Sequence, residues 1–240
     1  MDNKIRLDIF LTSFCNIQSR NKARELIEDK KIKIDNKIIT KPSFKVSKNN
    51  KIEILEDDFY VSRSAKKLKF FLEEISIDLT NQIALDIGSS TGGFTQILLQ
   101  NNVKNVYCVD VGTNQLHEKI KNNPKINMYE NTDIRDFISS TTFDIITCDV
   151  SFISILNILN DINRLATNKI IILYKPQFEV GNNVKRDSKG VVTDKKAIKL
   201  ARDKFLQKTA TFNWKLEYSN LSQIRGKNGN QEELFYFVVN

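Results

Sequence analysis

The chain contains few of the residues that build metal sites, disulfide frameworks and tight turns. Its 240 residues include one histidine, three cysteines, three prolines and eight glycines. Cys15, Cys108 and Cys148 have no paired spacing, which favours reduced thiols in an intracellular protein and gives no zinc motif. The single histidine, His117, excludes histidine-rich metal sites and a serine–histidine–aspartate triad. We therefore expect no metal site.

Long hydrophobic runs are absent as well. No segment approaches the roughly 20 apolar residues that cross a bilayer, and the first residues lack the basic-then-apolar pattern of a signal peptide. These absences predict a soluble, cytoplasmic protein. A membrane-lytic protein would need an amphipathic or spanning segment, and none is apparent in the sequence.

Positive charge is plentiful, and it is concentrated near the N-terminus. The formal net charge is +8. Residues 1–55 contain 13 Lys and Arg against 7 Asp and Glu, an excess of +6, and the other residues contribute 24 against 22, an excess of +2. A basic excess in one short segment is typical of a module that binds a polyanion.

The N-terminal 58 residues are predicted to form one small α+β domain. Residues 5–14 have helical periodicity, and Ser19 can cap a second helix with one apolar face. Apolar alternation over residues 32–39, around an Asp-Asn turn, predicts a β-hairpin. Residues 51–55 supply a further strand.

The rest of the chain alternates between predicted strands and helices. After a linker at residues 56–60, Ser62 or Ser64 can cap a helix, and the strand–helix alternation that follows predicts a mostly parallel sheet covered on both faces. Residues 225–231 are too short for a crossover helix, so the last two strands should pair antiparallel. The expected fold is α/β, a Rossmann-like seven-stranded domain at residues 59–240. The expected strands are 83–87, 106–110, 126–130, 143–149, 169–175, 215–224 and 233–239, and the expected helices are about 93–101, 114–121, 154–166 and 194–211.

The most informative segment, residues 83–95, consists of an apolar strand, a glycine loop and the start of a helix. Such loops let the backbone approach a nucleotide-like ligand, and the helix N-terminus offers free N–H groups. A dinucleotide-binding loop would have its second glycine where Ser90 stands, which disfavours an NAD-dependent dehydrogenase. The loop residues that we expect at the cofactor are Gly88, Gly92, Gly93 and Phe94.

Three carboxylates are predicted to complete the cofactor site. Asp86 ends the first strand and would point an anion at the ligand, which suits the sulfonium and amino groups of S-adenosylmethionine. Asp110 ends the second strand, where a carboxylate commonly accepts ribose hydroxyls. Asp133 follows the third strand and either faces the adenine amine or is an ordinary loop residue.

Four further ionisable residues are predicted to meet at the carboxyl edge of the sheet, where open parallel sheets bind ligands. Asp149 and Lys175 end two strands, Glu232 begins an antiparallel strand at the same edge, and Lys67 lies early in the preceding helix. A partly desolvated lysine beside another cation can act as a base near neutral pH. Lys175 is therefore the expected base for a substrate hydroxyl. Lys67 would favour its neutral form or steady the oxyanion, and the carboxylates would orient the lysines.

Four blocks of the sequence resemble the TlyA family, also called hemolysin A, and they lie at residues 62–68, 85–95, 149–154 and 175–181. The resemblance implies an S4 RNA-binding domain joined to an FtsJ-like methyltransferase domain. It further implies S-adenosylmethionine-dependent methylation of the ribose 2′-hydroxyl of cytidine in ribosomal RNA, in one or both subunits. The family's Lys-Asp-Lys-Glu tetrad falls on Lys67, Asp149, Lys175 and Glu232, with Glu233 as the alternative for the last position.

The S4 resemblance also implies a set of contacts to RNA phosphates. Phosphate contacts place a protein on RNA, while the base or the RNA shape specifies the site. The ribosomal subunits are the expected partners, and the oligomeric state stays open. A non-catalytic RNA-binding protein and a membrane-active hemolysin are the alternative functions. The expected phosphate contacts are Arg6, Arg20, Lys22, Arg24, Lys33 and Lys37.

Overall fold

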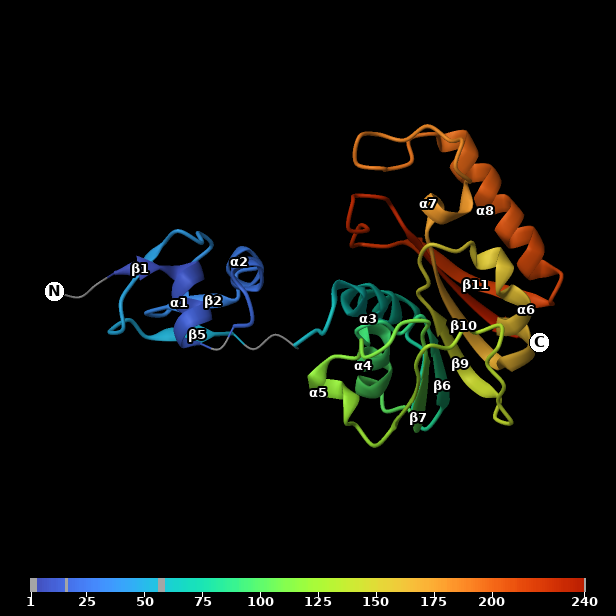
Figure 1. Ribbon diagram of the computed structural model, residues 1–240, viewed down its shortest axis with the longest axis horizontal. Coiled ribbons are helices and arrows are strands. Elements are labelled where there is room, and N and C mark those ends of the chain that lie inside the picture. Colours follow the sequence, from blue (N-terminus) through green and yellow to red (C-terminus); the bar gives the residue numbers. More distant parts are fainter. Residues whose placement is uncertain (1–3, 16, 56–58, 240) are drawn as a thin grey trace. The chain divides into compact units, whose positions relative to one another are not determined.

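The computed structural model describes residues 4–15, 17–55 and 59–239, and its chain divides into two compact units, residues 1–59 and 60–240 (Figure 1). The linker predicted at residues 56–60 falls largely on residues 56–58, which lie outside the described residues. None of the described helices combines the length and the apolar character that crossing a membrane requires.

The N-terminal unit packs two helices against short strands. Strand β2 lies between β3 and β5 in an antiparallel sheet, and β1 pairs with β4. The core is formed by apolar residues of both helices and of β2 and β4. The elements are β1 (Ile5–Arg6), α1 (Leu7–Phe14), α2 (Arg20–Glu28), β2 (Ile32–Ile34), β3 (Lys37–Ile38), β4 (Lys45–Val46) and β5 (Ile52–Ile54).

Local chemistry explains these elements. Ser19 caps α2, because its Oγ accepts a hydrogen bond from the backbone N–H of Lys22. Asp35 and Asn36 have φ angles of 47° and 67°, the left-handed conformation that a two-residue hairpin turn needs. The first helix begins at Leu7 and not at Ile5 as predicted, because the two preceding residues pair with β4.

The second unit is built on a seven-stranded sheet of order β11-β12-β10-β9-β6-β7-β8. Five strands are parallel, and β12 runs antiparallel to both β10 and β11, as predicted from the short connection. The strands are β6 (Ile83–Ile87), β7 (Asn105–Val109), β8 (Ile126–Tyr129), β9 (Phe143–Cys148), β10 (Ala166–Tyr174), β11 (Trp214–Leu221) and β12 (Glu233–Val239). The helices are α3 (Arg63–Ile75), α4 (Gly93–Gln100), α5 (Glu118–Lys121), η1 (Ile155–Asn157), α6 (Leu159–Leu165), α7 (Pro176–Glu179) and α8 (Lys195–Ala210).

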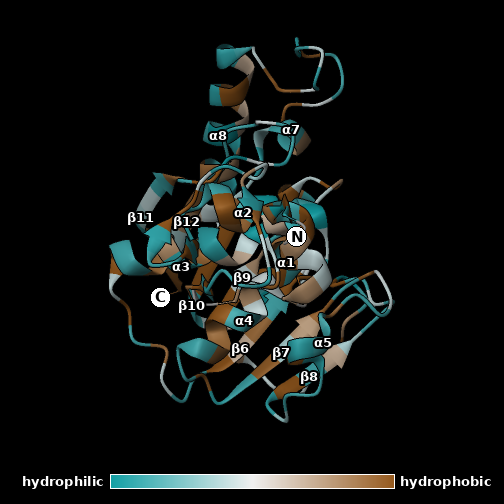
Figure 2. Cartoon of the chain, turned by 90° about the vertical axis from the view of Figure 1, so that its left-hand side faces the viewer, coloured by the Kyte–Doolittle hydropathy of each residue, from teal (hydrophilic) through white to brown (hydrophobic). Residues whose placement is uncertain are grey.

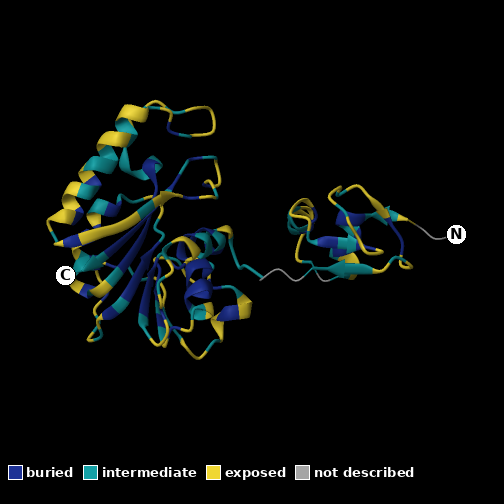
Figure 3. Cartoon of the chain, turned by 180° about the vertical axis from the view of Figure 1, so that it is seen from behind, coloured by how far each residue is buried: buried dark blue, intermediate teal, exposed yellow. Residues whose placement is uncertain are grey.

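Each face of this sheet has its own hydrophobic core. Alternate strand residues pack with α6 and α8 on one face and with α3 and α4 on the other. The central strands are accordingly apolar and buried, whereas α8 is exposed along its outer side (Figures 2 and 3). This is the α/β, Rossmann-like arrangement that the alternation of strands and helices predicted.

Several helix predictions were wrong in detail. The helix expected over 114–121 is a single turn, Glu118–Lys121, and the helix expected over 154–166 is split into η1 and α6. A turn of helix, α7, follows β10 and was not predicted; Pro176 occupies its first position, where the missing N–H costs nothing. Ser62 stands at the N-cap position of α3, but its hydroxyl contacts Ser64 at 2.8 Å and caps no backbone N–H.

Candidate active site

The glycine loop between β6 and α4 is shaped by close approach to its neighbours. Gly88 has a φ of +75°, and a Cβ there would lie 3.0 Å from the backbone oxygen of Asp149. A Cβ on Gly93 would collide with the hydroxyls of Ser62 and Ser64 at the start of α3. Gly92, with a φ of +86°, is the N-cap of α4. The glycines therefore let the loop touch the end of β9 and the start of α3.

Asp86 does not face this loop, contrary to the sequence expectation. Its side chain is fully buried, where Oδ2 accepts a hydrogen bond from Thr95 Oγ1 at 2.6 Å and Oδ1 accepts one from Thr147 Oγ1 at 2.9 Å. Burial raises the pKa of Asp86 to about 6, an effect that these hydrogen bonds oppose. The carboxylate therefore ties β6 to α4 and β9, and it is not among the lining residues of the three hollows at this edge of the sheet.

A cavity of about 440 Å³ lies beside the loop, at the carboxyl ends of β6, β7 and β9. Strands β7 and β9 flank β6 on opposite sides, so the cavity sits at the topological switch point of the sheet, the usual ligand site of an open α/β fold. Its volume falls in the range of small-molecule sites. The apolar lining comprises Ile87, Val109, Val111, Ile134, Val150, Phe152, Ile153 and Ile158, with Asp110, Asp133 and Asp149 among the polar lining residues.

The loop and the carboxylates at this cavity are held in defined positions. Asp110 accepts backbone N–H groups of Ser90 and Gly112, both at 2.7 Å. Asp133 pairs with Arg135 at 2.6 Å, which lowers the pKa of Asp133. Ser89 Oγ in the glycine loop is buried and has no hydrogen-bond partner among the described residues. The cavity therefore offers fixed acceptors, and the hollow over the glycine loop contains one unsatisfied hydroxyl, that of Ser89, which was not predicted from the sequence.

The four predicted tetrad residues come together as two ion pairs. Lys67 Nζ lies 2.5 Å from Glu232 Oε2, and Lys175 Nζ lies 2.6 Å from Asp149 Oδ1. Lys175 also donates to Ser151 Oγ at 2.8 Å. Burial raises the pKa of Asp149, and the nearby Lys175 and Lys67 ammonium groups oppose that rise. Two nearly desolvated cations are thus each matched to a carboxylate at one edge of the sheet.

The structure distinguishes the two adjacent glutamates. Glu232 is 3% exposed and also accepts a hydrogen bond from Gln177 Nε2 at 3.2 Å. Glu233 points elsewhere and forms a bidentate pair with Arg202, at 2.7 and 2.8 Å. Glu232 is therefore the member of the cluster, and Glu233 faces the other way because successive residues of an extended chain face opposite sides.

The cavity and the lysine cluster share walls. A second hollow of about 390 Å³, over the glycine loop, has Gly88 and Asp149 in common with the cavity. A third hollow of about 420 Å³ contains Lys67 and Glu232 and shares Lys175 and the exposed Lys227 with the second. A ligand in the cavity would therefore lie next to the lysines.

The two most distinctive sequence blocks are joined to each other by Glu179. Its carboxylate accepts hydrogen bonds from Ser154 Oγ at 2.6 Å and from the backbone N–H of Ile155 at 2.9 Å. Burial raises the pKa of Glu179 despite these bonds. The contact ties α7 to the segment after β9, and so fixes Lys175 relative to Asp149.

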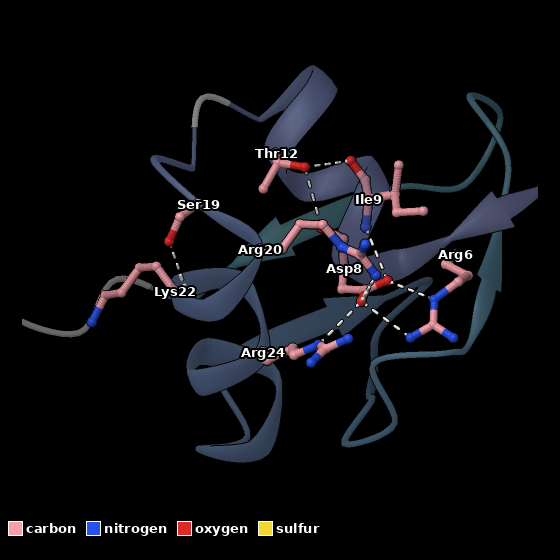
Figure 4. A network of polar contacts seen from close by, with 8 residues as sticks. All are labelled: Arg6, Asp8, Ile9, Thr12, Ser19, Arg20, Lys22 and Arg24. Atoms are coloured by element: carbon pink, nitrogen blue, oxygen red, sulfur yellow. Dashed lines mark hydrogen bonds and ion pairs between the residues drawn. The ribbon is translucent and has the colours of Figure 1, made fainter.

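The predicted RNA contacts lie in the N-terminal unit, where three of them converge. Arg6, Arg20 and Arg24 all bind the fully buried carboxylate of Asp8, at 2.9, 2.9 and 3.3 Å (Figure 4). Hydrogen bonds from Arg6 above all, and from the other two arginines, hold the pKa of Asp8 well below its usual value. The remaining candidates lie apart from this cluster: Lys22 pairs with Glu25 at 2.7 Å, Lys33 is half-buried in β2, and Lys37 is exposed in β3.

Comparison with known proteins agrees with this architecture. Residues 60–238 match the FtsJ-like methyltransferase model and residues 5–52 match the S4 domain model. A hemolysin-like protein of known structure from Streptococcus thermophilus superimposes with a TM-score of 0.71 at 26% identity, over 100% of this chain and 90% of that chain. The fold and the site thus define a Rossmann-like methyltransferase that carries an S4 domain.

Related sequences identify the family within this class of methyltransferases. The chain is 46% identical to the 23S rRNA (cytidine-2′-O)-methyltransferase TlyA of Campylobacter jejuni, over 98% of this chain and 100% of the relative. It is 35% identical to the 16S/23S rRNA (cytidine-2′-O)-methyltransferase TlyA of Mycobacterium tuberculosis, over 75% of this chain and 70% of the relative. The chain belongs to the TlyA family of FtsJ-like methyltransferases.

Proposed function

We propose that this protein transfers a methyl group from S-adenosylmethionine to the ribose 2′-hydroxyl of a cytidine in ribosomal RNA. The observation that carries the proposal is the pair of buried lysine–carboxylate contacts beside the cavity at the switch point. The family membership and the substrates named for the relatives support the same reaction.

The cavity fits the proposed cofactor. Its apolar walls suit the adenine ring, and Asp110 retains lone pairs for the ribose hydroxyls. The unsatisfied Ser89 hydroxyl lines the adjoining hollow over the glycine loop. Asp133 is the candidate acceptor for the adenine amine. When bound, S-adenosylmethionine supplies an electrophilic methyl group on a cationic sulfur.

The lysine cluster then deprotonates the substrate hydroxyl and stabilises the charge that develops on its oxygen. Lys175 enters the step as the neutral amine and accepts the proton of the ribose 2′-hydroxyl, whose oxygen takes the methyl group. Asp149 and Ser151 orient the Nζ of Lys175. Lys67, held by Glu232, places a second positive charge where the oxygen gains negative charge. The proposed step uses these four side chains and calls on neither a metal ion nor a histidine.

The proposal is tested with purified protein, labelled S-adenosylmethionine and ribosomal subunits lacking the modification. We expect label in cytidine 2′-O-methyl groups, identified by mass spectrometry of digested RNA. Calorimetric titration should show cofactor binding to wild type and to Lys175→Ala alike, with transfer lost only in the variant. Transfer to a base atom, or an active Lys175→Ala protein, would contradict the assignment.

A further inference from the structure

The cluster around Asp8 contains a feature that charge attraction to RNA does not explain. Asp8 is fully buried at the centre of three arginines in a unit with excess positive charge. A carboxylate at this place removes one positive charge from the surface that would face a polyanion. If net charge alone governed RNA affinity, the protein would bind better without it.

The geometry of the contacts indicates what Asp8 does. Arg6 donates Nε and Nη2 to the two carboxylate oxygens, Arg20 donates Nη2, and Arg24 donates Nε (Figure 4). Each guanidinium has about five N–H donors, so most of these donors are not used on Asp8. The three side chains stay 36%, 51% and 45% exposed. N–H donors therefore remain accessible on all three groups, while their contacts to one carboxylate hold the three guanidiniums together.

The same three arginines would repel each other without the carboxylate. Arg20 and Arg24 lie four residues apart on one face of α2, a spacing at which like charges are destabilising. Arg6 approaches them from β1. Asp8 offsets this repulsion and leaves a local charge of about +2, from three guanidiniums and one carboxylate.

We propose that Asp8 is a positioning residue, which gathers Arg6, Arg20 and Arg24 into one site for the phosphodiester backbone of the RNA. The inference rests on the proposed function for the identity of the RNA. Guanidinium forks match phosphate oxygens bidentately, and a charge of about +2 suits two successive phosphates of a strand. The backbone N–H of Ile9, at 3.1 Å, holds the carboxylate in the orientation that presents both oxygens.

The decisive experiment compares two variants that raise the net charge by the same unit. Asp8→Asn removes the central carboxylate, and Glu28→Gln removes an exposed carboxylate on the same helix as two of the arginines. Binding of the full-length protein to deproteinised ribosomal RNA is measured by filter retention over a series of KCl concentrations, without cofactor. We expect Glu28→Gln to bind as well as wild type or slightly tighter.

For Asp8→Asn we expect affinity to fall by about tenfold, although its charge is higher. The plot of log K against log salt should also become shallower, by roughly 0.7–0.9 for each phosphate contact that is lost. Binding by Asp8→Asn equal to or tighter than binding by Glu28→Gln would overturn the proposal. Circular dichroism of both variants checks that α1 and α2 are retained.

A second variant decides the question if Asp8→Asn fails to fold. Arg24→Lys keeps the charge at a partly exposed site but loses the planar fork, so we expect binding to weaken several-fold. Unchanged RNA affinity of Arg24→Lys would refute the proposal that Asp8 positions the arginines for phosphate. In methylation assays both variants should raise the KM for RNA far more than they change kcat, because the contacts of Asp8 lie within the N-terminal unit. Absence of methyl transfer by wild type would instead contradict the proposed function, and the binding comparison would still stand.

Discussion

Replacing Glu232 by glutamine leaves the Lys67 ammonium in a nearly closed site without its counter-charge. The side chains are 3% and 9% exposed, and their charged atoms are 2.5 Å apart. Loss of one partner from a buried ion pair costs about 3–5 kcal/mol, because the remaining charge stays desolvated. Glu232→Gln and Lys67→Met should each lower the free energy of unfolding by about 3 kcal/mol. In the double variant no charge is stranded, so its cost should fall short of the sum by about 2 kcal/mol.

The assay uses the chain's one tryptophan. Trp214 is 5% exposed in β11, so its fluorescence reports unfolding of the methyltransferase unit and not of the N-terminal unit. With a urea slope of roughly 2 kcal/mol per molar, each single variant should shift the midpoint down by about 1–2 M.

The neighbouring glutamate provides the matched control. Glu233→Gln breaks the pair with Arg202, whose side chain is 32% exposed, and should cost about 1 kcal/mol or less. It should also leave methyl transfer nearly intact, whereas Glu232→Gln should reduce it strongly. The reasoning about the site would be refuted if the losses in free energy of unfolding simply added in the double variant. It would also be refuted if Glu232→Gln and Glu233→Gln had equal effects on stability and methyl transfer.

Three further predictions follow from the loop and the strand ends. Gly88→Ala should weaken cofactor binding in calorimetry and lower stability by about 1–2 kcal/mol, because a side chain at positive φ is strained and its Cβ presses on Asp149; normal affinity would contradict the close approach. Lys175→Met should leave Asp149 buried without its cation and so raise the apparent pKa of that carboxyl further, measurable by NMR titration. Burial raises the pKa of Asp86 from its usual value to about 6, so folding favours the protonated carboxyl relative to the unfolded chain. Its stabilising contribution is complete below about pH 4 and lost as the pH rises through 6. Stability of wild type relative to Asp86→Asn should therefore fall by roughly 2 kcal/mol between pH 4 and pH 8.

The strands and the mostly parallel character of the sheet were largely predictable, because apolar runs bounded by loop residues carry strong local signals. The order of the strands in the sheet was not predicted. The antiparallel direction of the last strand was predicted from the short connection at residues 225–231. The same reasoning predicts Glu232 at the carboxyl edge of the sheet, since a strand of reversed direction starts where parallel strands end.

The errors arose where tertiary contacts override local pattern. Asp86 was predicted to point at the ligand because of its place near the end of a strand, but its carboxylate is buried and accepts hydrogen bonds from hydroxyls of α4 and β9. Nothing in the sequence around these hydroxyls indicates that they would hydrogen-bond to Asp86. Arg6 was placed in a helix for the same reason: only the pairing of β1 with β4 reveals the strand. The orphaned Ser89 hydroxyl is visible only once its surroundings are known.

The arrangement of the site couples cofactor binding to the orientation of the proposed base. The backbone of Asp149 rests against Gly88, and the same residue's carboxylate holds Lys175. A ligand that moves the glycine loop must therefore move the end of β9, and with it the lysine. Glu179 fixes α7 to the segment after β9, so its hydrogen bonds oppose movement of Asp149 relative to Lys175. The geometry at the lysine is thus set from two directions, by the glycine loop and by the two motif blocks.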